Sequence, residues 1–192
     1  MKKFELKISP KEFVILKSCT SIEKLFLFDE ITIVFIEGEE EYLLCNDFIK
    51  ESLDRLKLFL KQALKNLKFL DSSLNQDIGY MWNEVLQDKL PYKVNEELWV
   101  GLCFSLWEGG DDKKHFATWL YNDPDGNIVM HITENYPWHF RKKGESENYI
   151  SYNEFIRNYK PILIRIIPHQ VARQWLAQCE YLLATVRENE QR

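Results

Sequence analysis

Residues 98–133 read LWVGLCFSLWEGGDDKKHFATWLYNDPDGNIVMHIT, and this stretch decides the fold. Three strand-like runs alternate with two polar segments, in the order 98–107, 108–114, 115–121, 122–126 and 127–133. The second polar segment, Asn-Asp-Pro-Asp-Gly, has the composition of a tight turn, because proline presets φ and glycine accepts a positive φ. Strand-like runs joined by short turns predict a three-stranded antiparallel meander.

The chain downstream of the meander predicts two helices. Ser151 to Glu154 has the pattern of a capping box, and the helix that it starts should end before Pro161. After the apolar run 162–167, Pro168 begins a final helix with Trp175 on its apolar stripe. Because a one-sided apolar helix and an apolar sheet cover each other, we expect Trp175 to lie against the sheet.

The chain upstream of the meander predicts a mixture of strands and helices. Residues 2–8 alternate like a strand, and Ser9-Pro10 followed by Glu12 predicts a short helix over 10–18. The remaining expected elements are strands over 31–36 and 41–45 joined by a turn at 37–40, a long amphipathic helix over 47–69, and a helix over 77–90 that Pro91 stops.

Together these patterns predict an α+β fold. An antiparallel β-meander packs against a C-terminal helix, with an N-terminal hairpin and a long amphipathic helix before it. The chain of 192 residues fits a single domain. Within it, residues 1–70 could form an N-terminal subdomain, and residues 96–192 hold the sheet and the C-terminal helices.

Composition and cysteine spacing indicate the class of protein and its cellular compartment. Apolar residues make up 45% and charged residues 29%, which is typical of a globular protein. The first residues contain no unbroken apolar stretch of the kind that a signal peptide or a membrane span needs, so we expect a cytoplasmic protein. The four cysteines are widely spaced and form no CxxC pair, which indicates reduced, buried thiols rather than zinc ligands.

Few residues could carry chemistry. His131 and His139 could approach each other across the bend at 136–137 with Glu134 nearby, but a catalytic zinc site needs three well-placed ligands. Cys103 and His115 are the only nucleophile and base that adjacent strands could bring together, and the apolar run around Cys103 would raise its thiol pKa. We therefore expect no metal, no cofactor and no catalytic residue.

The charge distribution is more informative than any single residue. Residues 21–54 hold ten acidic residues against Lys24 and Lys50, a local balance of −8. Such a region suits a patch that steers a basic protein partner, and it argues against direct nucleic-acid binding. A solvated hairpin without a partner would show the same charges, so this alternative stays open.

Aromatic residues add a second candidate surface. Trp99 and Trp119 sit at strand spacing and are expected in the core, whereas Trp138 lies in a proline-flanked bend where an interface anchor can be exposed. The acidic turns and this bend supply the candidate binding residues, which are Glu37, Glu39, Glu40, Glu41, Asp111, Asp112, Tyr136, Trp138 and His139.

Six short segments resemble a known group of proteins: 98–101, 118–123, 125–128, 136–138, 159–161 and 171–176. Together they resemble bacterial immunity proteins of polymorphic toxin and contact-dependent growth inhibition systems, over about residues 96–177. The resemblance implies a cytoplasmic protein that binds one cognate toxin domain, often a nuclease, and blocks its active site or substrate surface. It transfers no functional residues.

Two hypotheses of different classes follow. The first is a non-enzymatic immunity protein that neutralises a toxin through a protein–protein interface. The second is a small enzyme or ligand-binding domain with its site in the sheet cleft near Trp107, His131 and Trp138. Convergent polar groups in a pocket would favour the second hypothesis.

Overall fold

The fold is described from a computed structural model, for residues 3–21, 24–70, 77–87, 104–110, 114–137 and 149–191. Its elements are, in chain order, β1 (Lys3–Ser9), β2 (Glu12–Lys17), β3 (Glu30–Glu37), β4 (Glu40–Phe48), α1 (Ile49–Ala63), α2 (Ile78–Leu86), β5 (Ser105–Gly110), β6 (His115–Asn122), β7 (Ile128–Asn135), α4 (Tyr152–Asn158), β8 (Leu163–Ile167) and α5 (His169–Glu190). The fold class is α+β, as predicted.

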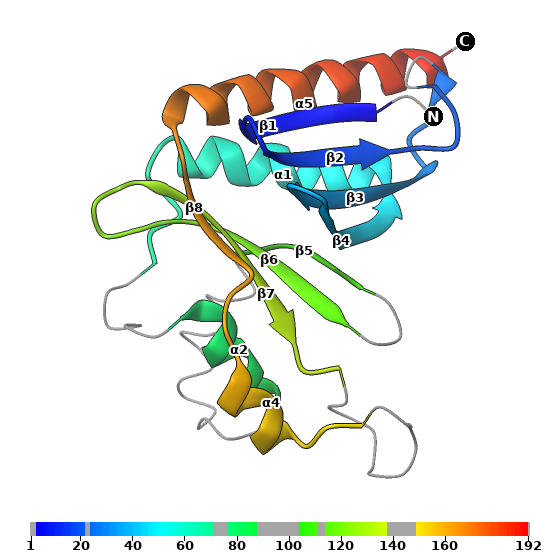
Figure 1. The fold of residues 1–192 in the computed structure, drawn as a ribbon. Helices are drawn as coiled ribbons and strands as arrows, with labels where there is room; N and C mark the ends of the chain where they lie inside the picture. Colours follow the sequence, from blue (N-terminus) through cyan, green and yellow to red (C-terminus); the bar gives the residue numbers. More distant parts are fainter. Residues whose placement is uncertain are drawn as a thin grey trace.

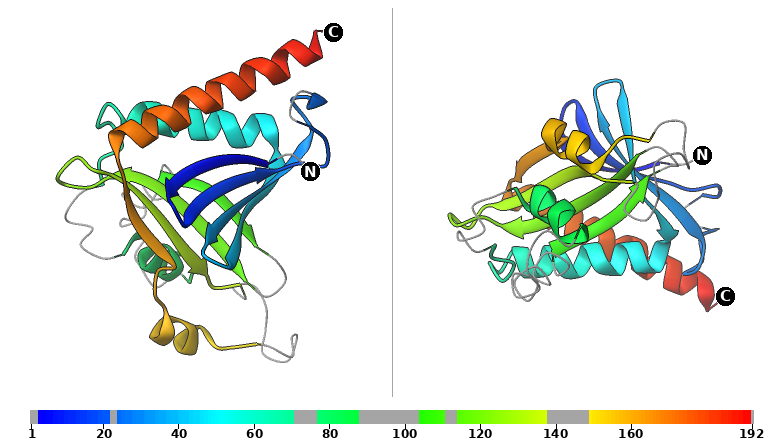
Figure 2. Two further views of the ribbon diagram at one scale, coloured as in Figure 1. Left: turned by 45° about the horizontal axis from the view of Figure 1, so that its top comes forward. Right: turned by 90° about the horizontal axis from the view of Figure 1, so that it is seen from below.

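The strands form two antiparallel sheets of four strands each. The N-terminal sheet has the order β1-β2-β3-β4, and the second sheet has the order β5-β6-β7-β8. The helices α1 and α5 lie side by side at one end of the molecule, and α2 and α4 lie at the other end (Figures 1 and 2). Helix α1 contacts strands of both sheets, while α2 packs on β7.

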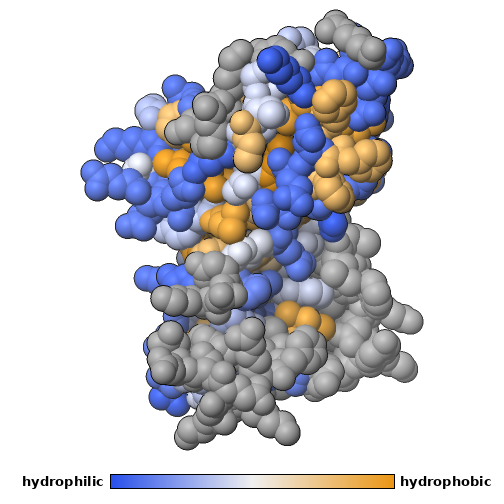
Figure 3. Space-filling view, turned by 90° about the vertical axis from the view of Figure 1, so that its right-hand side faces the viewer, coloured by the Kyte–Doolittle hydropathy of each residue, from blue (hydrophilic) through white to orange (hydrophobic). Residues whose placement is uncertain are grey.

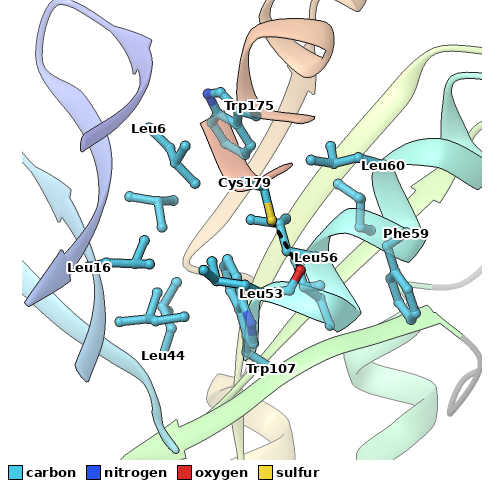
Figure 4. Packing of buried hydrophobic residues seen from close by; sticks show 14 of the residues in the cluster. Leu6, Leu16, Leu44, Leu53, Leu56, Phe59, Leu60, Trp107, Trp175 and Cys179 are labelled. Carbon is cyan, nitrogen blue, oxygen red and sulfur yellow. Dashed lines mark hydrogen bonds between the residues drawn. The ribbon is translucent and has the colours of Figure 1, made fainter. Parts of the chain in front are cut away.

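One large cluster of buried apolar side chains includes residues from both sheets and both long helices. Figure 4 shows Leu6 and Leu44 of the N-terminal sheet facing Leu53 of α1, with Trp107 of β5 and Trp175 of α5 in the same layer. The indole N–H of Trp175 donates to the Lys7 carbonyl at 3.2 Å. Trp175 therefore contacts β1 of the N-terminal sheet, whereas the sequence predicted that it would lie against the meander.

The expected helix over 10–18 is wrong, because these residues form a turn and β2. The Ser9 hydroxyl accepts a hydrogen bond from the Lys11 N–H at 3.4 Å, so it stabilises the turn instead of beginning a helix. β2 pairs with β1 on one side and β3 on the other. The apolar, partly β-branched run Phe13–Leu16 packs more favourably in an interior strand than in a helix.

The long amphipathic helix is present but shorter than the predicted 47–69. Residues 47 and 48 end β4, and α1 stops at Ala63. Asn66 adopts a φ of +54°, a left-handed conformation that ends helices. The next residues pair with β6, where the Lys68 N–H donates to the Asn122 side chain at 3.2 Å. This tertiary contact favours an extended chain over continuation of the helix.

The meander is confirmed where the structure describes it. β5, β6 and β7 are consecutive antiparallel neighbours, and Gly126 has a φ of +81° in the turn between β6 and β7. The polar segment 108–114 was expected to be a loop, but Glu108, Gly109 and Gly110 continue β5. A Cβ at Gly109 would come within 2.5 Å of the Leu44 carbonyl carbon, so glycine permits β5 to lie directly on β4.

Candidate functional site

The acidic turn predicted at 37–40 is the tip of the β3–β4 hairpin. Glu37 pairs with Glu40, which leaves Gly38 and Glu39 as a two-residue loop. Gly38 has a φ of +63°, the conformation that such a loop requires at its first position. Glu39, Glu40 and Glu41 are exposed, as a solvated turn predicts.

Two of the four predicted carboxylates at this tip are bound within the domain. The Glu41 carboxylate forms an ion pair with the Lys17 ammonium group of β2. Glu37 lies 3.5 Å from the Arg165 guanidinium of β8, which also donates to Glu12 at 2.7 Å and so links the two sheets. Within the part of the chain that the structure describes, Glu39 and Glu40 have no ion-pair partner, so they form the exposed acidic tip.

The aromatic bend has a different character from the one expected. Tyr136 is 3% exposed, its hydroxyl donates to the Ile150 carbonyl at 2.8 Å, and its ring packs against Tyr152 and Phe155 of α4. Tyr136 therefore joins a small core beneath α4 and is not available to a partner. The other candidates Asp111, Asp112, Trp138 and His139 lie outside the described residues.

The alternative site near Trp107 and His131 does not form as one cleft. Trp107 packs into the main core on the α1 side of the second sheet, and its indole N–H donates to the Ser52 carbonyl at 3.4 Å. His131 pairs across the sheet with Trp119, whose side chain packs with Trp82 of α2. Trp107 pairs with Thr118, which precedes Trp119 on β6. Because side chains at neighbouring positions of a strand point to opposite faces, Trp107 and His131 face opposite sides of the sheet.

A partly buried polar network surrounds Asp77 where α2 meets the second sheet. One oxygen of its carboxylate accepts hydrogen bonds from the backbone N–H groups of Gly79 (2.9 Å) and Tyr80 (3.0 Å) and from the Tyr159 hydroxyl (2.6 Å). The other oxygen lies 3.3 Å from Nε2 of His131. Asp77 is thus the N-cap of α2 and the centre of its attachment to β7.

The electrostatics of this network favour the ionised carboxylate. Burial alone would raise the pKa of Asp77, but the interactions with His131 and Tyr159 outweigh it, and the pKa is lowered. Burial and the nearby Asp77 charge raise the pKa of Tyr121 to about 12. His131 is only 1% exposed. The network combines acid, base and phenol groups, but its histidine is closed to solvent, which suits a structural role.

The sequence predicted the helix that begins at Asp77 but not the partners of this residue. Asp77 and His131 are 54 positions apart, and Tyr159 lies in a third segment. The only local signal is an acidic residue before an apolar helical pattern, which is an N-cap signal. Nothing in that signal points to His131.

Two cavities open on the surface of the described residues. The first has a volume of about 670 Å³ and lies between α1, β4 and β5, with the carboxylates of Asp47, Glu51, Asp54 and Glu108 along its lining and Arg55 among them. We call it the acidic groove. The second has a volume of about 500 Å³ and is lined by Lys114, Glu134 and Tyr159 among others. No pattern in the sequence predicted either cavity.

Glu134 is the titratable group of most interest in the second cavity. Burial raises its pKa, and the Lys114 ammonium group only partly offsets that effect. A carboxyl group with a raised pKa can act as a general acid or base. Burial raises the pKa of purely structural carboxyl groups in the same way.

The described residues contain no group of three or more His, Cys, Asp and Glu side chains that could hold a metal ion. Among the helices that the structure describes, none has the length and apolar character needed to cross a membrane. No family model, curated protein or solved structure matches this chain.

Proposed function

We propose that this protein is an immunity protein, which binds a cognate bacterial toxin domain and neutralises it through a protein–protein interface. One contrast supports the proposal most. His131, the base beside Asp77, is closed to solvent, whereas Glu39 and Glu40, which have no ion-pair partner in the described chain, are exposed at the end of the β3–β4 hairpin. Exposed charge on a fixed scaffold suits recognition of a charged partner.

The partner that fits this surface is a basic protein. Charges at the rim of an interface act mainly on the rate of encounter, because they attract the partner before contact. A nuclease toxin must bind a polyanion and therefore tends to carry a basic surface. The protein would cover that surface and exclude the nucleic acid.

The experiment is co-expression with a toxin whose gene lies next to the gene of this protein, followed by measurement of association and dissociation rates with purified components. The Glu39→Lys/Glu40→Lys variant should associate at least tenfold more slowly at low salt, and the difference should shrink as salt rises. Asp125→Lys/Glu154→Lys carries the same charge change at exposed positions elsewhere and is the matched control. Lack of protection and of complex formation by the parent protein would refute the proposal.

Trp138 provides a second arm of this experiment. If Trp138 is a buried anchor in the complex, Trp138→Ala should speed dissociation by an amount that corresponds to about 2 kcal/mol. The association rate should change little, since the substitution leaves the charge unaltered. Circular dichroism must first show that the variant is folded.

The second cavity favours a different function, a small enzyme or ligand-binding domain. The half-buried Glu134 beside Lys114 is the observation behind it. A screen of small metabolites by thermal shift would test this alternative, with Glu134→Gln as the variant. A ligand that raises the melting temperature of the parent protein, but not that of the variant, would support it over the immunity function.

A further inference from the structure

The segment Leu25-Phe26-Leu27-Phe28 before β3 presents aromatic side chains to solvent. Leu25 and Leu27 pack against the main core, whereas Phe26 is 49% exposed and Phe28 is 64% exposed. The segment thus alternates between core and solvent, with a phenylalanine at each outward position. Exposed phenylalanines that are neighbours are informative, because large apolar side chains are usually buried.

This segment is held in place from both sides. On the α5 side, the Leu27 N–H donates to the Glu190 carboxylate at 2.9 Å, and the Asn189 amide donates to the Leu25 carbonyl at 2.9 Å. On the α1 side, the first helical N–H groups, those of Ile49 and Lys50, donate to carbonyls of Asp29 and Leu27. The phenylalanines therefore stand on an ordered backbone, which lowers the entropy that binding would cost.

Phe48 contacts one of these two phenylalanines. It ends β4, is 40% exposed, and packs edge-on against Phe28 with 6.0 Å between ring centroids. We call Phe26, Phe28 and Phe48 the aromatic trio. Figure 3 looks at this side of the molecule, where apolar side chains stand among hydrophilic ones in the upper part of the face.

Carboxylates surround the aromatic trio. The segments 24–30 and 46–51 hold four acidic residues, Asp29, Glu30, Asp47 and Glu51, against Lys24 and Lys50. Lys50 pairs with Glu51 at 3.0 Å, and Lys57 pairs with Asp54 of the acidic groove at 2.7 Å. Asp47 and Glu108 have no ion-pair partner among the described residues, so they are the groove carboxylates open to a partner. Asp47 and Glu51 also line the acidic groove, and Asp47 directly precedes Phe48, so the groove begins next to the trio.

We propose that the aromatic trio and the acidic groove together form the docking surface for a basic protein partner. The trio would contact an apolar side chain of the partner, and the groove would receive lysine or arginine side chains. Aromatic anchors beside charged positions are the usual composition of an interface core and its rim. The identification of this partner with a toxin depends on the proposed function, but the chemistry of the partner does not.

The test uses a defined probe, a twelve-residue peptide of alternating leucine and lysine, with glutamate in place of lysine in the control peptide. NMR titration of the labelled protein should shift amide signals of residues 24–30 and 46–51, and the lysine peptide should bind at least tenfold more tightly than the glutamate peptide. Phe28→Ala/Phe48→Ala should weaken binding of the lysine peptide at least tenfold. Leu67→Ala, which removes another exposed apolar side chain, should change it less than twofold.

Several outcomes would overturn the proposal. One is a set of shifts confined to the tip at Glu39 and Glu40, and another is equal binding by the Phe28→Ala/Phe48→Ala variant and the parent protein. A parent dimer that these substitutions dissociate would instead assign the surface to a second copy of the chain. The toxin provides the separate arm. If the parent and the variant neutralise the toxin equally well, the proposed function stands and the assignment of this surface is wrong. If the peptide binds here and the toxin does not bind, the surface stands and the proposed function is wrong.

Discussion

Replacing Asp77 tests the central claim about how α2 is attached to the second sheet. Asp77→Ala removes the acceptor of two backbone N–H groups and of the Tyr159 hydroxyl, and it leaves His131 without its carboxylate. Asp77→Asn keeps the shape and one acceptor oxygen but removes the charge. The pair of variants therefore separates helix capping from charge.

The magnitude follows from the contacts that are lost. Loss of an N-cap costs about 1 kcal/mol, and loss of a hydrogen bond to a charged group costs about 1.5–3 kcal/mol. The two losses together amount to about 2.5–4 kcal/mol. For a chain of this size, Asp77→Ala should lower the melting temperature by about 5–16 °C, and Asp77→Asn by about half as much.

Urea denaturation, monitored by circular dichroism, measures the difference in unfolding free energy between parent and variants. The pH dependence of that difference identifies its origin. Because the folded-state pKa of Asp77 is lowered, the ionised carboxylate stabilises the fold above the ordinary value of 3.8, and this contribution is lost as pH falls through the folded pKa. The charge-dependent gap between parent and Asp77→Asn should be complete at pH 7 and close below pH 3.8. Equal stability at pH 7, or a gap that persists unchanged in acid, would refute the assignment.

Three further predictions concern single positions. Gly126→Val places a β-branched residue at a φ of +81° and should cost about 1–3 kcal/mol, so an unchanged melting temperature would contradict the turn assignment. Glu134→Gln should stabilise the protein at pH 7, because burial raises the carboxyl pKa and penalises the charge, and the gain should vanish as pH falls below 4.5. Iodoacetamide should label the exposed Cys19 of the native protein and spare Cys179, whose pKa burial raises to about 12; peptide mass mapping distinguishes the two.

The parts of the fold that the sequence predicted are those set by local chemistry. The segment from Asn122 to Gly126 forms its turn largely by itself, since the Asp123 carboxylate accepts hydrogen bonds from the N–H groups of Asp125 and Asn127. The segment after Ser9 carried an equally local signal for a helix and became β2 instead. Pairing with strands on both sides decided its state, and a local pattern contains no information on such pairing.

The same distinction applies to the candidate site. Exposure of Glu39 and Glu40 followed from the turn, but the partner of Glu41 lies 24 residues away and that of Glu37 lies 128 residues away. Tyr136 was expected near a surface, and the rings of α4 bury it. The aromatic trio joins two segments of the chain that meet only in the folded protein, so no sequence pattern marked it.

The acidic tip and the aromatic trio lie at opposite ends of the β3–β4 hairpin. Their separation leads to a final prediction. β4 runs from Glu40 at the acidic tip to Phe48 in the trio, and nine residues of strand span roughly 26 Å. Sites so far apart should contribute independently to binding. Charge reversal at Glu39 and Glu40 should therefore slow association, loss of Phe28 and Phe48 should speed dissociation, and the combined variant should show the sum of both free-energy changes within about 0.5 kcal/mol. A larger coupling in a thermodynamic cycle with the toxin would mean that the partner does not contact the two ends separately, and the division into a steering tip and an anchoring trio would be wrong.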